Sequence, residues 1–544
     1  MLPRPTTRPS WLPLRLIVAG AAMSCALLGW SRVPPVEWPR FLAGLTSVSA
    51  DGTTLATAMG GRAGTTMLIV ASALLVAVTA GFAVAFFAMR IRCGLPWLAG
   101  FIARFAAALP VAAIGCLAVG WIVGQNGWSI ESLVPNHPPT DKDSWEFALG
   151  RRAWFWAVPC WVLALPLVGE CATQVLDVFS KFRRSELHKG LRARGLKRSL
   201  IHYHHDCPAV WPELLDMIEA LGPLAFGYVV FVEDALAVPG WGSFFANALK
   251  NGDAHGIAGS IYAAGWLTAA WCLCIGVVRR LSAGVPRSSQ VPDQPPATVD
   301  VKKISAIASV LLAAFFCCSF GGLPQLTASA ACLASAFAGY ASPLVGDLRS
   351  VSAALAVALI LTLVRSAFSL AFRKAPPPGG GLLETLSWSP LLVWLIGIST
   401  VLKAPEFDWV APGVAAAFGG AVHVRNRWRE LQSSRALEAS RAVGTGRLRA
   451  WRMHVLPDLF RTVLAWMLHL AATLMVWFAL IDTVKQPAPH APATSLGTAI
   501  AAAKENVLSD LQPMLIPALL TAICALFFRQ LSRIVRPAPP PHPH

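Results

Sequence analysis

Residues 66–89, TMLIVASALLVAVTAGFAVAFFAM, form a run of 24 residues without a charged side chain. About 20 consecutive apolar residues are enough for an α-helix to cross the hydrocarbon core of a bilayer. Lipid offers no hydrogen-bond partner to the backbone, so a segment of this kind must satisfy its own N–H and C=O groups as a helix. We therefore expect residues 66–89 to form a membrane-spanning helix.

Comparable runs recur along the chain and predict an all-α, polytopic membrane protein with about 12 transmembrane helices. The expected spans are 12–30, 66–89, 99–124, 154–176, 211–232, 257–278, 304–320, 351–372, 388–402, 409–424, 460–481 and 513–529. Segment 323–346 is rich in small residues, and we expect it to be a loop or a re-entrant piece. Composition agrees, because only 13% of the residues are charged, against about 25% in soluble domains.

The distribution of basic residues predicts the orientation. Loops 177–207 and 425–452 each carry eight Lys and Arg, whereas loop 125–150 carries only Lys142. Loops rich in Lys and Arg stay in the cytoplasm, so we expect both termini there and an uncleaved first helix. The net charge of +17 is then explained by cytoplasmic loops that face anionic lipid, and nucleic acid is not an expected partner.

A polar, proline-rich segment divides the spans into two groups of six. Its residues 285–298, VPRSSQVPDQPPAT, have the composition of a linker. We expect a first half at 1–284, a cytoplasmic linker at 285–303, a second half at 304–536 and a Pro/His tail at 537–544.

The two halves share a basic segment. KGLRARGLKRSLIHYHHDCP at 189–208 aligns without a gap on EASRAVGTGRLRAWRMHVLP at 438–457, at a shift of 249 residues. The identical pairs are Arg192 with Arg441, Ala193 with Ala442, Gly195 with Gly444, Arg198 with Arg447, His205 with His454 and Pro208 with Pro457. Both copies precede a span in the cytoplasm, which predicts two parallel six-helix repeats with a transport pathway between them.

These residues carry a family resemblance. Glu438-Ala439-Ser440, followed by Gly444 and Leu456-Pro457, resembles the EAA signature of binding-protein-dependent ABC importer permeases. Segment 229–253 is similar to the outer segment of the first permease subunit of the peptide/nickel group. The matching residues are Glu233, Pro239, Gly240, Gly242 and Asp253.

Segment 485–500, KQPAPHAPATSLGTAI, is similar to the proline-rich outer loop of the partner subunit of that group. The resemblance implies the type I ABC importer permease fold, with two permease subunits fused in one chain. It also implies coupling loops at 186–208 and 433–457 that dock ATPase subunits. The residues assigned to this coupling are Arg192, Ala193, Gly195, Pro208, Glu438, Ala439, Arg441, Gly444 and Pro457.

The resemblance implies partners as well. We expect two ATP-binding cassette ATPase subunits, a periplasmic or lipoprotein substrate-binding protein, and a place in the bacterial inner membrane. A phosphate-binding loop needs a Gly-Lys pair, and the sequence contains none. We therefore expect that the chain is not an enzyme and does not itself bind a cofactor. ATP and Mg²⁺ would be held by the partner ATPase.

The expected cargo is short peptides or a related small solute. A nickel or metal-chelate importer is an alternative, and so is a channel or secondary transporter without an ATPase. Lys189-Gly190-Leu191 stands where the family has Glu-Ala-Ala, and WFALIDTVKQ replaces a glycine-rich run. Because of these departures, a degenerate scaffold that derives from a permease and does not transport is a further alternative.

Two ionisable residues are candidates for the pathway. Glu219 lies eleven residues after Pro208, and His469 lies twelve residues after Pro457. Ionisable groups inside spans are costly and often functional, so both are expected to face the cavity. The alternative is polar contact between helices. The histidines of 202–205 lie in the coupling loop rather than in the pathway, and we expect no metal site there.

Overall fold

The computed structural model describes residues 12–30, 54–90, 95–126, 145–183, 186–196, 198–201, 207–282, 339–371, 394, 396–397, 400, 407–432, 435–484, 493–504 and 512–535. Almost all of these residues are helical, which confirms the all-α expectation for the described part of the chain. The helices of the first half are α1 (Leu12–Trp30), α3 (Leu55–Arg90), α4 (Leu95–Ala108), α5 (Val111–Asn126), α7 (Trp145–Arg183), α8 (Glu186–Ala193), α9 (Arg198–Ile201), α10 (Cys207–Ala235), α11 (Trp241–Asn251) and α12 (Ala254–Leu281).

The second half follows a similar order of helices. They are α15 (Ala341–Ala371), α18 (Phe407–Gln432), α19 (Arg435–Ala442), α20 (Arg447–Ala450), the π-helix η3 (Trp451–Val455), α21 (Leu456–Val484), α22 (Leu496–Lys504) and α23 (Gln512–Val535). Among the described residues, seven helices are long and apolar enough to cross a membrane, which makes the chain a multi-pass membrane protein. α1 is a shorter apolar helix.

The span expected at 99–124 is wrong as a single helix. Leu98–Ala108 and Val111–Gly120 meet at an angle of 88°. The break lies at Pro110, which has no N–H for a helical hydrogen bond and disfavours helical geometry in the residue before it. Its carbonyl accepts the Ile114 N–H at 3.2 Å, so Pro110 begins the second arm of the bend.

The last residues of segment 323–346 are helical, because α15 begins at Ala341. The helix extends this far because its first turns pack against the segment before α22, where an added Cβ on Gly346 would lie 2.3 Å from the Thr494 carbonyl oxygen. Residues 323–338 and the span expected at 304–320 lie outside the described residues. Only Trp394, 396–397 and Thr400 of the span expected at 388–402 are described, and they are helical. The count of twelve spans therefore stays a prediction.

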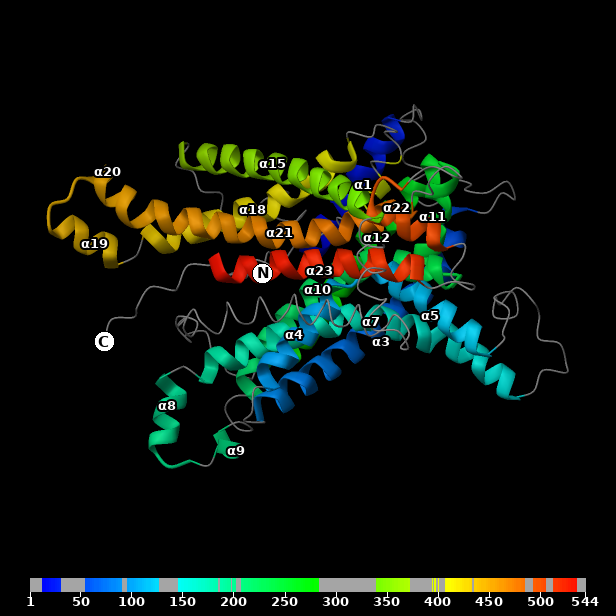
Figure 1. Ribbon diagram of the computed structural model, residues 1–544, viewed down its shortest axis with the longest axis horizontal. Helices are drawn as coiled ribbons and strands as arrows, with labels where there is room; N and C mark the ends of the chain where they lie inside the picture. The colour runs from blue at the N-terminus through cyan, green and yellow to red at the C-terminus, as the bar shows by residue number, and fades with distance from the viewer. Residues whose placement is uncertain are drawn as a thin grey trace.

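The long helices run side by side, and the short elements gather at the two ends of the bundle (Figure 1). α8 and α9, from the first half, lie at the left end in that view, as do α19 and α20 from the second half. α11 and α22 lie together at the opposite end. Each half thus sends one short helical element to the same end of the molecule.

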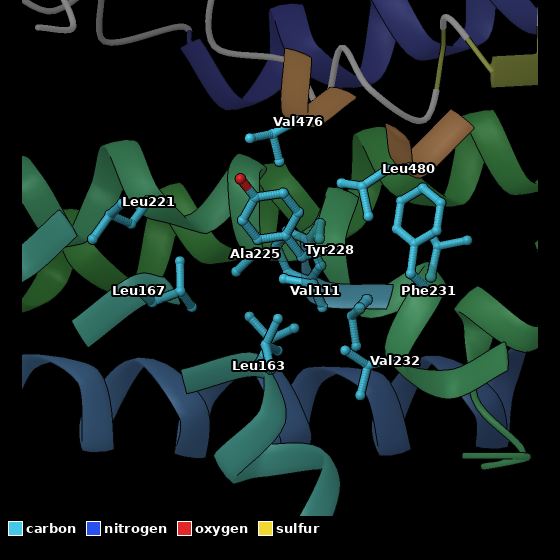
Figure 2. Packing of buried hydrophobic residues seen from close by; sticks show 14 of the residues in the cluster. Val111, Leu163, Leu167, Leu221, Ala225, Tyr228, Phe231, Val232, Val476 and Leu480 are labelled. Atoms are coloured by element: carbon cyan, nitrogen blue, oxygen red, sulfur yellow. The ribbon is translucent and has the colours of Figure 1, made fainter. Parts of the chain in front are cut away.

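The apolar core is continuous across the two halves. Figure 2 shows Tyr228 and Phe231 of α10 pointing toward Val476 and Leu480 of α21. A second cluster joins the arm after the bend in the first half to the last helices of the second half. It contains Ala113, Cys116, Ile500, Ala503, Met514 and Ala518. Within a bilayer, van der Waals packing across this surface holds the halves together, because lipid tails are as apolar as the side chains and give no hydrophobic driving force.

Candidate functional site

The candidate coupling elements are α8–α9 and α19–α20. α8 and α19 have eight residues each, and α9 and α20 have four each. Every one of their bounds differs by the 249 residues that separate the two sequence copies. The helices that follow, α10 and α21, also begin and end 249 residues apart, and each has 29 residues.

Both elements turn at a glycine in the left-handed region. Gly195 has φ +77° and Gly444 has φ +80°. In each case the next N–H reaches back five residues, from Leu196 to the Leu191 carbonyl at 3.4 Å and from Thr445 to the Ser440 carbonyl at 3.1 Å. This is the Schellman arrangement that ends a helix. A Cβ at either glycine would have nothing within 4 Å, so only the backbone conformation demands glycine there.

Seven of the nine predicted coupling residues are accessible in the structure. Arg192, Ala193, Gly195, Glu438, Ala439, Gly444 and Pro457 are exposed. Pro208 is the second residue of α10, where proline is tolerated because the first N–H groups of a helix have no intrahelical acceptor. Pro457 is the second residue of α21, which continues without a break from the π-helix η3. Arg441 lies in α19, one turn before Gly444.

The sequence interpretation missed two exposed apolar side chains, one between α19 and α20 and one in η3. Val443, directly before Gly444, is 85% exposed, and Met453 is 60% exposed. Exposed apolar side chains that gather on one element indicate a contact with another protein. At the position of Val443, the first element has the exposed Arg194.

The second element is anchored to the bundle by its own small core. Leu431, Leu437, Ala450 and Val455 are buried against one another. Trp428 of α18 meets Trp451 edge to face at a centroid distance of 5.9 Å. The element is thereby tied to both the helix before it and the helix after it, so a force on it reaches α18 and α21.

At the opposite end, Glu233 caps the N-terminus of α11. Its buried carboxylate accepts the Thr66 hydroxyl at 2.7 Å, the Gly242 N–H at 2.6 Å and the Ser243 N–H at 3.3 Å. Thr66 also accepts the Trp241 N–H at 2.8 Å. The first N–H groups of a helix have no intrahelical acceptor, and a carboxylate there also complements the helix dipole.

The two glycines of this segment leave room for the cap. A Cβ on Gly240 would lie 2.2 Å from the Glu233 carboxylate, and one on Gly242 would lie 2.6 Å from the Val230 Cα. Pro239 is exposed in the turn between α10 and α11. The predicted outer-segment residues are therefore brought together, and the contacts they make are structural.

The second half has a comparable cap that the sequence interpretation missed. Asp347 of α15 accepts the Leu496 N–H at 3.0 Å, and Asp482 accepts the Ser495 hydroxyl at 2.6 Å. A Cβ on Gly497 would lie 2.6 Å from the Ala479 carbonyl oxygen. One signal was available, since Asp482 follows Glu233 by the same 249 residues.

The two predicted pathway residues differ in their surroundings. Glu219 is buried and lies 3.2 Å from Arg279 of α12, which also binds Asp216 at 2.6 Å. This contact joins two helices of one half, as in the alternative of polar contact between helices. His469 is half-buried on α21, and its carbonyl accepts the Thr473 hydroxyl at 3.2 Å. A role of either residue in the pathway stays a prediction.

Among the described residues, three ion pairs cross from the first half to the second, and the sequence interpretation missed all three. They are Glu170 of α7 with Arg529 of α23 at 2.7 Å, Asp177 of α7 with Arg533 of α23 at 3.4 Å, and Asp234 of α10 with Lys504 of α22 at 3.2 Å. In each pair the first half supplies the carboxylate and the second half supplies the cation. Pairing of helices so far apart in sequence cannot be read from local patterns, although ionisable residues in apolar spans were a signal.

The described part of the chain is thus a multi-helix membrane bundle whose short helical elements gather at its two ends. Residues 378–539, which contain α18 to α23 and the second coupling element, match the family described as binding-protein-dependent transport system inner membrane component. The second half therefore carries an ABC transporter permease domain. No curated protein gives a significant match to the chain. The histidines of 202–205 lie outside the described residues.

Proposed function

We propose that this chain is the transmembrane permease of an ATP-binding cassette importer of the peptide/nickel type, with two permease subunits fused in one polypeptide. The family match supports this for the second half. For the first half, the support is a coupling element with the same helix lengths, the same spacing and the same left-handed glycine. Each half would contribute six spans in the same orientation.

The observation that carries the proposal is the pair of matched elements at one end of the bundle (Figure 1). Each element would dock one ATPase subunit, which would hold ATP and Mg²⁺. A chain without a phosphate-binding loop needs such a partner to use ATP. Exposed Val443 supplies apolar contact area for the partner, while Arg449 and Arg452 supply charge for acidic groups on it.

The coupling end would face the cytoplasm, and the end with α11 and α22 would receive a periplasmic or lipoprotein binding protein. ATP-driven closure of the ATPase pair would pull the two elements together. The attached helices would then move as rigid bodies, since packed helices switch between arrangements rather than deform continuously. The cargo would be short peptides or a related small solute, carried across the bacterial inner membrane, with both termini of the chain cytoplasmic.

A second candidate, a permease-derived scaffold without transport, is favoured by one observation. The first element has Lys189, Gly190 and Leu191 where the second has Glu438, Ala439 and Ser440. A nickel or metal-chelate importer is the alternative for the cargo.

The deciding experiment is purification of the intact chain from its native membranes, followed by reconstitution with the proteins that accompany it. We expect an ATPase to co-purify, and ATP to drive uptake of short peptides into the liposomes. Absence of an ATPase would favour a channel or secondary transporter. A bound ATPase without uptake would favour the scaffold. Uptake of a nickel chelate but of no peptide would show that the cargo is the chelate.

A further inference from the structure

The three described ion pairs between the halves are spread along their interface. Asp234 is the residue before the last of α10, next to α11, and its partner Lys504 ends α22. Glu170 and Asp177 lie in the part of α7 that leads to the first coupling element. Glu170 is 13 residues before Arg183, which places it about 20 Å along the helix from that end. The Asp234–Lys504 pair therefore lies at the α11 and α22 end of the interface. The Asp177–Arg533 pair lies toward the coupling end, and the Glu170–Arg529 pair lies between the two, on the coupling side of Asp234.

The Glu170–Arg529 pair joins two spans. Its side chains are only 22% and 13% exposed, before any lipid is considered. Two opposite charges can be kept in such a place when they are paired, but parting them without water would leave two uncompensated charges at great cost. Any motion that separates α7 from α23 must therefore admit water. An ion pair can therefore hold two helices together when no water is present, and its two charges can be hydrated when the helices separate and water enters.

A third arginine provides a partner for the open arrangement. Arg104 of α4 interacts electrostatically with Asp177, Arg529 and Arg533. Its Nε is buried and, within the described residues, has no hydrogen-bond partner. α4 is held against α7, since a Cβ on Gly169 would lie 2.2 Å from the Ala103 carbonyl oxygen. When α23 moves away, Arg104 stays beside α7 and can receive Asp177.

We propose that these ion pairs are the two gates of the translocation pathway. Asp234 with Lys504 closes the outer gate, and Glu170 with Arg529 closes the cytoplasmic gate, assisted by Asp177 with Arg533. The assignment rests on the proposed transport function, because gates have meaning only in a pathway. Both gates are closed in this structure. Transport requires that they open one at a time, with Arg104 stabilising the open cytoplasmic gate.

The test uses the intact chain alone in liposomes loaded with radiolabelled glycylglycine. Two gates in series predict that Glu170→Lys or Asp234→Lys alone leaves the liposomes tight, because the other gate still closes the path. The double variant should raise release at least about tenfold, since like charges facing each other across an interface are strongly unfavourable. Adding Arg529→Glu to the double variant should restore the cytoplasmic gate and abolish the leak.

The matched control is an ion pair of the same kind within one half. Asp216→Lys breaks the 2.6 Å contact with Arg279, which joins α10 to α12 of the first half. Combined with Glu170→Lys, it should leave the liposomes tight. Melting temperature and gel filtration in detergent establish that every variant is folded.

Three results would overturn the proposal that these ion pairs are gates. They are a tight, folded double variant, a leak from one single variant as large as that from the double, and an equal leak from the Asp216 control. The assay needs no ATPase, binding protein or ATP. Failure of ATP-driven uptake would therefore count against the proposed function without deciding the gates.

Discussion

At the residue scale, Glu233 shows how one carboxylate can organise an entire segment. It gathers a hydroxyl from α3 and two N–H groups from α11 around a buried position. The close approach requires glycine at positions 240 and 242. The spacing of glutamate, proline and glycines, known from the sequence as a pattern, is thus explained by a helix cap.

Glu233→Gln should destabilise the fold. The amide nitrogen that replaces one carboxylate oxygen cannot accept a hydrogen bond, so a buried donor of Thr66 or of α11 loses its acceptor. The expected cost is about 1–3 kcal/mol, measured as a lower melting temperature or denaturation midpoint in detergent. Glu438→Gln, at an exposed position of α19, is the control and should leave stability unchanged. Equal stability of Glu233→Gln and the native chain would show that the cap contributes little.

The second-half cap shows where residue patterns stop being informative. Glu233 and Gly242 are nine residues apart, so their spacing can be recognised in the sequence. Asp347 and Leu496 are 149 residues apart and meet only because α15 packs beside α22. Local spacing contains no information on such a pair, which is why Asp347 was not among the predicted site residues.

At the scale of elements, the sequence repeat predicted where the matched short helices lie, and their role in coupling stays a prediction. α8 and α19 both end shortly before the aligned glycines. Pro208 is the second residue of α10, whereas Pro457 lies in a helix that runs on from η3. The bend in the span expected at 99–124 was harder to predict, because Pro110 interrupts a run that is apolar on both sides. Apolar length alone does not say whether a proline kinks a helix or turns it by 88°.

Gly444→Ala should uncouple transport more severely than Gly195→Ala. Both residues have positive φ, where alanine costs about 1–2 kcal/mol, and neither change creates a clash. The second element also retains Glu438 and is anchored by the contact of Trp428 with Trp451. The measurement is peptide uptake per ATP hydrolysed in the reconstituted complex.

The control for that comparison is Gly190→Ala. Gly190 is exposed in α8 and has neither a positive φ nor a neighbour within 4 Å of an added Cβ. Alanine is favoured over glycine in a helix by about 1 kcal/mol, so this variant should keep full coupling. Equal losses from Gly195→Ala and Gly444→Ala would show that the two elements contribute alike.

At the scale of the whole molecule, the two halves are held together by contacts that do not depend on the polypeptide segment that links them. α23 packs against α4 and α5, and an apolar cluster joins α5 to α22 and α23. We expect the chain to tolerate a cut in the predicted linker 285–303. Fragments 1–284 and 304–544, produced together, should co-purify through a tag on either one.

The cut chain gives its own control. With Ala113→Asp, which places a carboxylate in the apolar cluster between the halves, recovery of the untagged fragment should fall. Recovery of only the tagged fragment from the unmodified pair would show that covalent continuity is what keeps the halves together.

The distribution of charge across the interface has a consequence for assembly. The positions 249 residues after Glu170, Asp177 and Asp234 are Gly419, Asn426 and Thr483, none of which is charged. Two copies of the second half, facing each other, would leave Lys504, Arg529 and Arg533 without acidic partners. The halves are therefore not interchangeable, and mismatched pairing is penalised by unpaired charge inside the membrane. Joining them in one polypeptide also ensures that they are made in equal numbers.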